Sequence, residues 1–100
     1  MKKRIPVACT LGPTEAVDQL GEWQDLQRSL LSVDRISGGV RLRLPVEVHA
    51  SAVDLARREQ NCCRFLVITV TVEESEVILD ITSDQPEAGP VIDLLAGLMT

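Results

Sequence analysis

A chain of 100 residues is long enough for one hydrophobic core, and we expect a single domain over residues 1–100. Its composition, 45% hydrophobic and 25% charged, excludes a largely disordered protein. The net charge of -5 argues against a nucleic-acid partner, because such a protein needs a basic surface to neutralise phosphates.

The start of the chain has some features of an export signal, since a basic run is followed by Val7-Ala8-Cys9. The apolar stretch between them is too short for a signal, however, and Pro6 interrupts it. No run approaches the roughly 18 apolar residues of a membrane span. We therefore predict a cytoplasmic protein without a membrane segment. In that compartment, cysteines favour free thiols, metal binding or redox chemistry over a disulfide framework.

The first half of the chain predicts a strand, a helix and a second strand. Residues 5–11 are apolar, include Cys9, and are typical of a strand. Residues 13–32 predict a helix, and Trp23 is expected in the core from its place in an apolar stripe. The stripe consists of Ala16, Leu20, Trp23, Leu26, Leu30 and Leu31. After a turn at Ser37-Gly38-Gly39, residues 40–44 alternate apolar side chains with Arg41 and Arg43, as in a strand with one solvated face.

The second half predicts a helix, a hairpin and a last helix. The second helix covers residues 47–63, and residues 64–72 and 76–82 form strands joined by a turn at Glu73-Glu74-Ser75. The last helix covers residues 91–99 and packs through Val91, Leu94, Leu95 and Leu98. The order βαβαββα predicts an α+β two-layer sandwich, in which helices cover one face of a four-stranded, mostly antiparallel sheet.

The end of the second helix concentrates the groups that could carry chemistry. Residues three and four apart share a helix face, so Glu59 faces both Cys62 and Cys63. Glu59 also lies inside the apolar arc, where an unpaired carboxylate would be costly. Such departures from binary patterning often mark function. The alternative is a structural role, with buried cysteines and with Glu59 paired to Arg28, Arg41 or Arg43.

The setting of these thiols favours a metal over a nucleophile. A helix C-terminus carries partial negative charge, and both this charge and Glu59 should raise the thiol pKa values. Soft ions such as Zn(II), Cu(I) or Hg(II) can displace the thiol proton. Zinc usually takes four ligands, so Cys9 is the expected third thiol. The helical rise puts His49 roughly 20 Å from Cys62, which excludes it as a co-ligand.

A family resemblance supports the same site. Cys9-Thr10-Leu11, a helix with Trp23, and Glu59-x-x-Cys62-Cys63-x-Phe65 before a hairpin are similar to a family of short, mostly uncharacterised bacterial proteins. Its members share an E-x-x-C-C-x-[FW] signature and an N-terminal cysteine. The family commonly has proline where Arg64 stands here. The resemblance implies a shared site at these residues without implying a reaction.

Three functions follow as hypotheses. The leading one is a small thiol-rich protein that binds a soft metal or metalloid through Cys9, Cys62 and Cys63, with Glu59 as a nearby base or extra ligand. The second is a thiol-dependent enzyme with Glu59 as general base. The third is a non-catalytic interaction module that forms a homodimer through an exposed strand edge. We assign no catalytic residue and favour a binding protein over an enzyme.

Overall fold

Pairs of strands alternate with helices in the computed structural model, which describes residues 13–98. The elements are α1 (Pro13–Gln27), β1 (Ser32–Ile36), β2 (Gly39–Pro45), α2 (His49–Cys62), β3 (Val67–Glu73), β4 (Glu76–Thr82) and α3 (Gly89–Ala96). Short 3-10 turns, Val46–Val48 and Pro86–Ala88, lead into α2 and α3. None of the helices in this range is long and apolar enough to cross a membrane.

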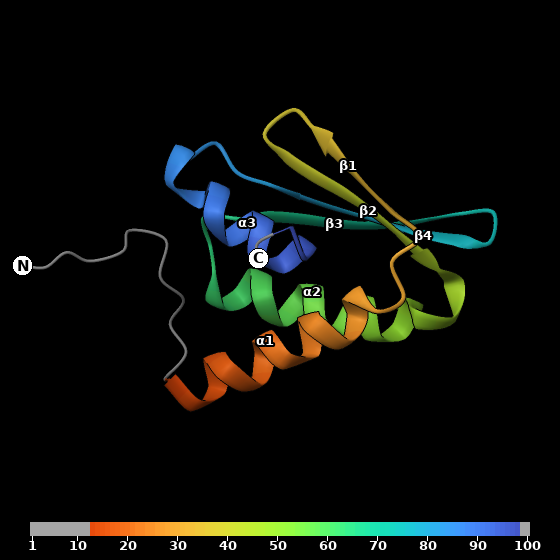
Figure 1. Cartoon of the computed structure of the whole chain (residues 1–100), viewed down its shortest axis with the longest axis horizontal. Coiled ribbons are helices and arrows are strands. Elements are labelled where there is room, and N and C mark those ends of the chain that lie inside the picture. Colours follow the sequence, from red (N-terminus) through yellow and green to blue (C-terminus); the bar gives the residue numbers. More distant parts are fainter. Residues whose placement is uncertain (1–12, 99–100) are drawn as a thin grey trace, which may run out of the picture.

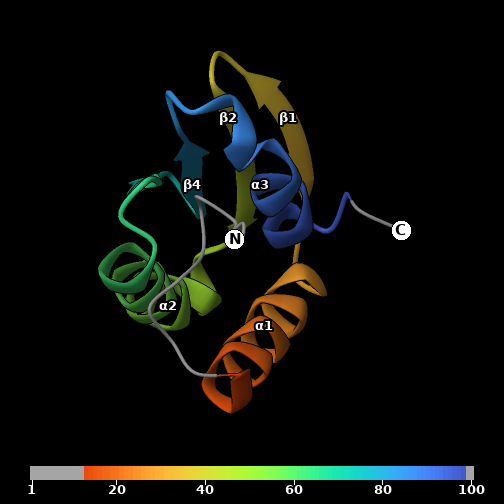
Figure 2. The same cartoon turned by 90° about the vertical axis from the view of Figure 1, so that its left-hand side faces the viewer.

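The four strands form one antiparallel sheet in the order β1-β2-β4-β3. All three helices lie on the same side of this sheet (Figures 1 and 2). Helix α2 lies against β3, α3 lies against β2, and α1 contacts both other helices. The predicted α+β sandwich with helices on one face is therefore confirmed. The strand predicted at residues 5–11 lies outside the described residues.

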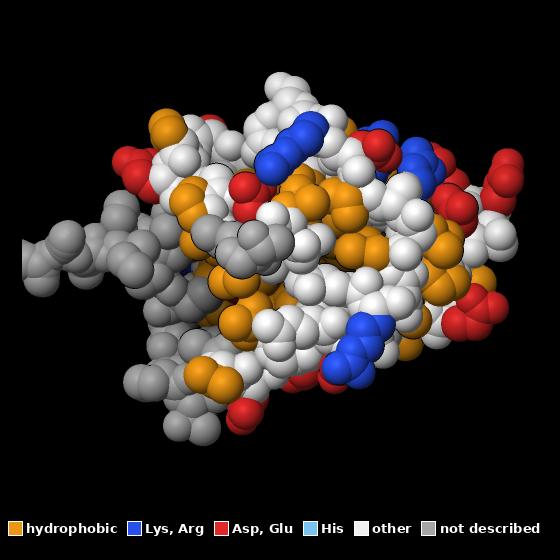
Figure 3. Space-filling view, viewed as in Figure 1, with side chains coloured by type: hydrophobic (Ala, Val, Ile, Leu, Met, Phe, Trp, Pro, Cys, Tyr) orange, Lys and Arg blue, Asp and Glu red, His pale blue; other side chains and the backbone are white. Residues whose placement is uncertain are grey.

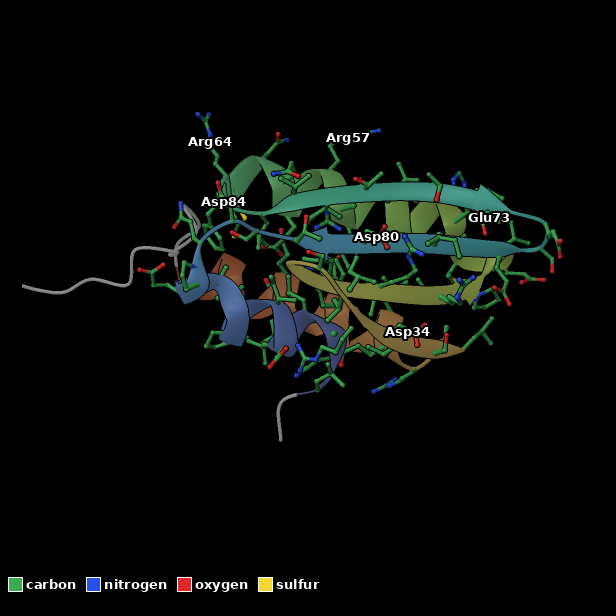
Figure 4. All side chains as sticks on the ribbon, turned by 90° about the horizontal axis from the view of Figure 1, so that it is seen from above. Asp34, Arg57, Arg64, Glu73, Asp80 and Asp84 are labelled. Atoms are coloured by element: carbon green, nitrogen blue, oxygen red, sulfur yellow. The ribbon has the colours of Figure 1, made fainter. Side chains whose placement is uncertain are left out.

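Period-two alternation in β2 and β4 separates a dry face from a solvated one. Strand β2 turns Val40, Leu42 and Leu44 toward the helices, and β4 does the same with Val77, Leu79 and Ile81. The face away from the helices carries mostly polar residues, and Figure 4 shows Asp34, Asp80 and Glu73 on it. Ile78 is a buried apolar residue of the same face. The second-strand arginines lie on this outer face as predicted. They are paired with carboxylates of the neighbouring strand, Arg41 with Asp80 at 2.9 Å and Arg43 with Glu76 at 3.4 Å.

The region between α1 and β2 differs from the prediction. Helix α1 ends at Gln27 and not near Ser32, and Ser32–Ile36 forms the edge strand β1, which the helical pattern did not predict. The apolar residues Leu30 and Leu31 continue the helical stripe, but Leu31 is exposed and donates its backbone N–H to the carbonyl of Arg43 at 2.7 Å. Pairing with β2 thus replaces the expected last turn of the helix and adds a fourth strand to the sheet.

The core fills the space between sheet and helices with aliphatic side chains around Trp23, which is fully buried as predicted. In Figure 3, apolar side chains are visible between the elements of this side of the molecule. Helix α3 packs through Ile92, Leu95 and Ala96, whereas Leu94 and Leu98 are exposed, contrary to the prediction. Ile92, Leu95 and Ala96 are three and four residues apart and form the buried stripe, and Leu94 lies outside it.

Two glutamines join elements that are distant in sequence. Gln27, a polar residue in the apolar stripe of α1, donates through Nε2 to the carbonyl oxygens of Leu94 (3.1 Å) and Leu95 (2.8 Å) near the end of α3. Gln60 accepts the backbone N–H of Ile68 at 2.8 Å and donates to the carbonyl of Leu66. It thereby fixes the last turn of α2 to the first residues of β3.

Candidate functional site

The last turn of α2 brings Glu59, Cys62 and Cys63 into one buried cluster. One carboxylate oxygen and the two sulfurs lie within 4.8 Å of one another. The three residues are only 4%, 6% and 0% exposed, respectively. Cys62 is the last residue of the helix, and Cys63 caps it by donating its backbone N–H to the carbonyl of Glu59 at 2.7 Å. The convergence expected from i, i+3 and i, i+4 spacing is therefore present.

Helix α1 holds one oxygen of the Glu59 carboxylate. Oε1 accepts a hydrogen bond from Trp23 Nε1 at 2.7 Å and another from Gln19 Nε2 at 3.0 Å. Gln19 and Trp23 are one helical turn apart, so both donors come from the same face of α1. These neutral donors satisfy an oxygen that would otherwise be buried at a large cost.

Gln19 and Trp23 belong to the site although the sequence did not predict them there. Trp23 was expected in the core, which is where it lies, but its indole N–H is also a site donor. The sequence offered one signal that could have identified them: Gln19 is a polar residue four positions before a tryptophan expected in the core. It is itself only 7% exposed.

The arginines considered as partners for Glu59 have other partners. Arg41 pairs with Asp80 and Arg43 with Glu76 on the far side of the sheet. Arg28, just after α1, pairs with Asp25 at 3.5 Å. That structural alternative for Glu59 is therefore wrong. The donors given above take the place that an arginine was expected to fill.

The second carboxylate oxygen faces the sulfurs. Glu59 Oε2 lies 2.7 Å from Cys63 Sγ and 3.7 Å from Cys62 Sγ. The two sulfurs are 3.5 Å apart. Gln19 Nε2 also lies 3.5 Å from Cys62 Sγ, so the same amide contacts both the carboxylate and a sulfur. The carboxylate thus has one oxygen held by α1 and one oxygen directed at the cysteines.

The surroundings disfavour a thiolate at Cys62. Burial raises the pKa of the Cys62 thiol, and the charge of Glu59 raises the pKa further. The hydrogen bond from Gln19 acts in the opposite direction but does not outweigh these effects. Without a cation nearby, a strong nucleophile at this position is therefore disfavoured, as the position of the thiols in the sequence predicts.

The two adjacent cysteines differ in covalent state. Cys62 is a free cysteine, whereas Cys63 is disulfide-bonded. Cys63 can therefore act as an ion ligand only after reduction. Cys9, the expected third thiol, lies outside the described residues. His49 is the first residue of α2 and Cys62 the last, which agrees with excluding His49 from the cluster.

Comparisons with known proteins add no assignment. The chain matches no known family model, no curated protein and no solved structure. The geometry of the cluster is therefore the main evidence for function.

Proposed function

We propose that the reduced protein binds a soft metal or metalloid ion through Cys62 and Cys63, with Glu59 beside the ion and Cys9 as a further thiol. The observation that carries this proposal is the buried cluster of two sulfurs and one carboxylate oxygen within 4.8 Å. Thiolate ligands select soft ions such as Zn(II), Cu(I) and Hg(II), and binding of such an ion displaces the thiol protons. The raised pKa of the Cys62 thiol makes a cation the most direct way to form a thiolate there.

The hydrogen bonds of Glu59 support the same proposal. A residue that contacts a metal or its ligands is usually oriented by further hydrogen bonds, which fix its geometry and basicity. Trp23 and Gln19 supply these bonds to Oε1 and leave Oε2 directed at the sulfurs. We further propose that the protein is cytoplasmic, where the reducing environment would keep Cys62 and Cys63 available as thiols.

Titration of the reduced protein with Zn(II), Cu(I) and Hg(II), followed by native mass spectrometry, tests the site. We expect one ion per chain, and loss of that ion in the double variant Cys62→Ser, Cys63→Ser. His49→Ala is the matched control, because His49 is exposed at the far end of the same helix and should leave binding unchanged. Stoichiometric binding that survives the double cysteine variant would overturn the assignment.

A thiol-dependent enzyme is the second candidate, favoured by one contact. Glu59 Oε2 lies 2.7 Å from Cys63 Sγ, so after reduction of Cys63 it would be close enough to take the proton of the Cys63 thiol. This function predicts that one thiol of the reduced protein reacts with iodoacetamide much faster than the others near neutral pH, and that Glu59→Gln slows this reaction. Slow alkylation at the same rate for every cysteine would exclude it.

A further inference from the structure

Cys63 is disulfide-bonded, and the geometry of adjacent residues disfavours Cys62 as its partner. Cys62 is a free cysteine. Consecutive Cα atoms lie about 3.8 Å apart, whereas the Cα atoms of a disulfide usually lie about 4.4–6.8 Å apart. The chain has three cysteines, and the third is Cys9. Within one chain, Cys9 is therefore the only candidate for the partner of Cys63.

A disulfide at Cys63 removes a donor from the proposed ion site. The thiolate is the form of cysteine that binds metals, and a disulfide sulfur has no proton to lose. In the described part of the cluster, Cys62 and Glu59 are the donors that remain while Cys63 is oxidised. Zinc is usually held by three or four protein ligands, so two donors should bind it weakly.

The end of α2 is held by bonds that do not involve the sulfurs. Cys63 donates its backbone N–H to the carbonyl of Glu59 at 2.7 Å, and its own carbonyl accepts the N–H of Leu66 at 3.1 Å. Both are bonds between backbone groups, so neither requires the disulfide. Reduction should therefore return the Cys63 thiol beside Cys62 without rebuilding the helix end.

The hydrophobic core gives the fold a source of stability other than this disulfide. It contains residues of all three helices and of β2 and β4, packed around fully buried side chains such as Trp23 and Leu79. Disulfides are needed for folding mainly in small secreted domains with too little core, whereas cytosolic disulfides are usually transient and serve catalysis or redox sensing. A reversible bond therefore explains Cys63 better than a structural one.

We propose that a reversible disulfide between Cys9 and Cys63 switches ion binding at the cluster off, and that its reduction switches binding on. This inference rests on the proposed binding function and adds its regulation. The oxidant is a low-molecular-weight disulfide, RSSR, which takes two electrons from the Cys9 and Cys63 thiols. One S–S bond forms between these residues, the S–S bond of RSSR breaks, and the two thiol protons leave on two RSH molecules. A dithiol reverses the reaction and is itself oxidised to a disulfide.

The first measurement locates the bond. The full-length protein is oxidised with glutathione disulfide, its free thiols are alkylated under denaturing conditions, and its tryptic peptides are analysed by mass spectrometry without reduction. Cleavage after arginine and lysine gives residues 5–28, which contain Cys9, and residues 59–64, which contain Cys62 and Cys63. We expect these two peptides to be cross-linked. Cys62→Ser should keep the cross-link, and Cys63→Ser should lose it. The opposite result, or a cross-link found only in a covalent dimer, would overturn the inference.

The second measurement compares Zn(II) binding in the two states by isothermal titration calorimetry, after glutathione is removed and intact mass shows no mixed disulfide. We expect the oxidised protein to bind Zn(II) at least about 100-fold more weakly than the reduced protein, because donors on one chain act at high effective concentration. Reduction with dithiothreitol, which is then removed, should restore binding. Cys9→Ser is the matched control. It cannot form the bond, so the same oxidation should leave its Zn(II) affinity unchanged.

The outcomes separate this inference from the proposed function. Equal Zn(II) binding by the reduced and oxidised protein, lost in Cys62→Ser, Cys63→Ser, would refute the switch and leave the binding function standing. If the reduced protein shows no cysteine-dependent binding of Zn(II), Cu(I) or Hg(II), the proposed function fails and the switch fails with it, even where the cross-link is found. A loss of binding on oxidation that also occurs in Cys9→Ser would overturn the switch. Circular dichroism of both states checks that the fold is retained.

Discussion

At the scale of single residues, Glu59 is a carboxylate that is only 4% exposed and therefore needs hydrogen-bond donors. A buried carboxylate is tolerated only with strong donors, and hydrogen bonds to a charged group contribute roughly 1.5–3 kcal/mol each. Trp23 and Gln19 supply two such bonds. The spacing of Glu59, Cys62 and Cys63 could be predicted from one helix, because local periodicity determines which residues share a face. The donors from α1 could not, because they depend on how two helices pack.

Removal of the indole donor tests this account. Trp23→Phe keeps an aromatic ring in the core but lacks Nε1–H, so it should lower the free energy of unfolding by about 2 kcal/mol. Urea denaturation of the reduced protein measures the change. In a Glu59→Gln background the loss should be smaller, with an interaction energy above about 0.5 kcal/mol. Strictly additive effects would show that the Trp23–Glu59 contact contributes little, since the double-mutant cycle cancels the change in ring size.

The raised pKa of Cys62 has a consequence for alkaline stability. Above about pH 8.5, the ordinary pKa of cysteine, the unfolded chain loses the Cys62 proton while the folded protein retains it. The unfolded state is therefore favoured as the pH rises, until the pH exceeds the folded-state pKa. We expect the free energy of unfolding to fall between about pH 8 and 10. Chemical denaturation across this range should give a smaller fall for Cys62→Ala; equal falls would contradict the pKa shift.

At the scale of elements, strands could be predicted where apolar and polar residues alternate clearly. They could not be predicted where apolar residues also fit the spacing of a helix. The alternation in residues 40–44 and the hairpin at residues 64–82 predicted β2, β3 and β4, although β3 begins later than expected, at Val67. Strand β1 was missed because Leu30 and Leu31 extend the helical stripe. Its pairing with β2 requires the turn at Gly38, whose φ of +80° favours glycine.

The next residue, Gly39, must be glycine for a different reason, because the backbone of β4 lies very close to it. A Cβ atom at Gly39 would lie 1.9 Å from the carbonyl oxygen of Ile81, a backbone atom that cannot move alone. Gly39→Ala should therefore lower the free energy of unfolding by more than about 2 kcal/mol. Gly21→Ala in α1 is the matched control. A Cβ there meets nothing within 4 Å and should stabilise the helix by up to about 1 kcal/mol. Thermal unfolding of both variants checks the contrast, and equal stability would contradict it.

At the scale of the whole molecule, the sheet ends in strand edges that bear on assembly. Strand β3 is one edge, with Val67 and Val72 about half exposed, but the amide of Gln60 already occupies backbone groups at its start. Such a side chain blunts an edge that could otherwise pair with another chain. A homodimer through this edge stays a prediction, and it would have to form through the remaining residues of β3.

Ion binding should stabilise the whole fold. An ion that binds only the folded state adds about 2.7 kcal/mol to the free energy of unfolding at a hundred times its dissociation constant. We expect the thermal midpoint of the reduced protein to rise with Zn(II) and to return when Zn(II) is removed with EDTA. Cys62→Ser, Cys63→Ser should abolish the rise, and Glu87→Gln, an exposed control, should keep it. Stoichiometric binding without any rise would mean that the unfolded thiols bind equally well.

The α+β architecture, the helix end that carries Glu59, Cys62 and Cys63, and the exclusion of His49 could all be predicted from the order of residues. They depend on periodicity and helical rise, which are local. Tertiary packing was needed to learn that α1 orients Glu59 through Trp23 and Gln19, that the arginines pair elsewhere, and that the sulfurs are buried 3.5 Å apart. Those features depend on the packing of α1 against α2 and of both helices on the sheet, so they appear only when segments distant in sequence are brought together.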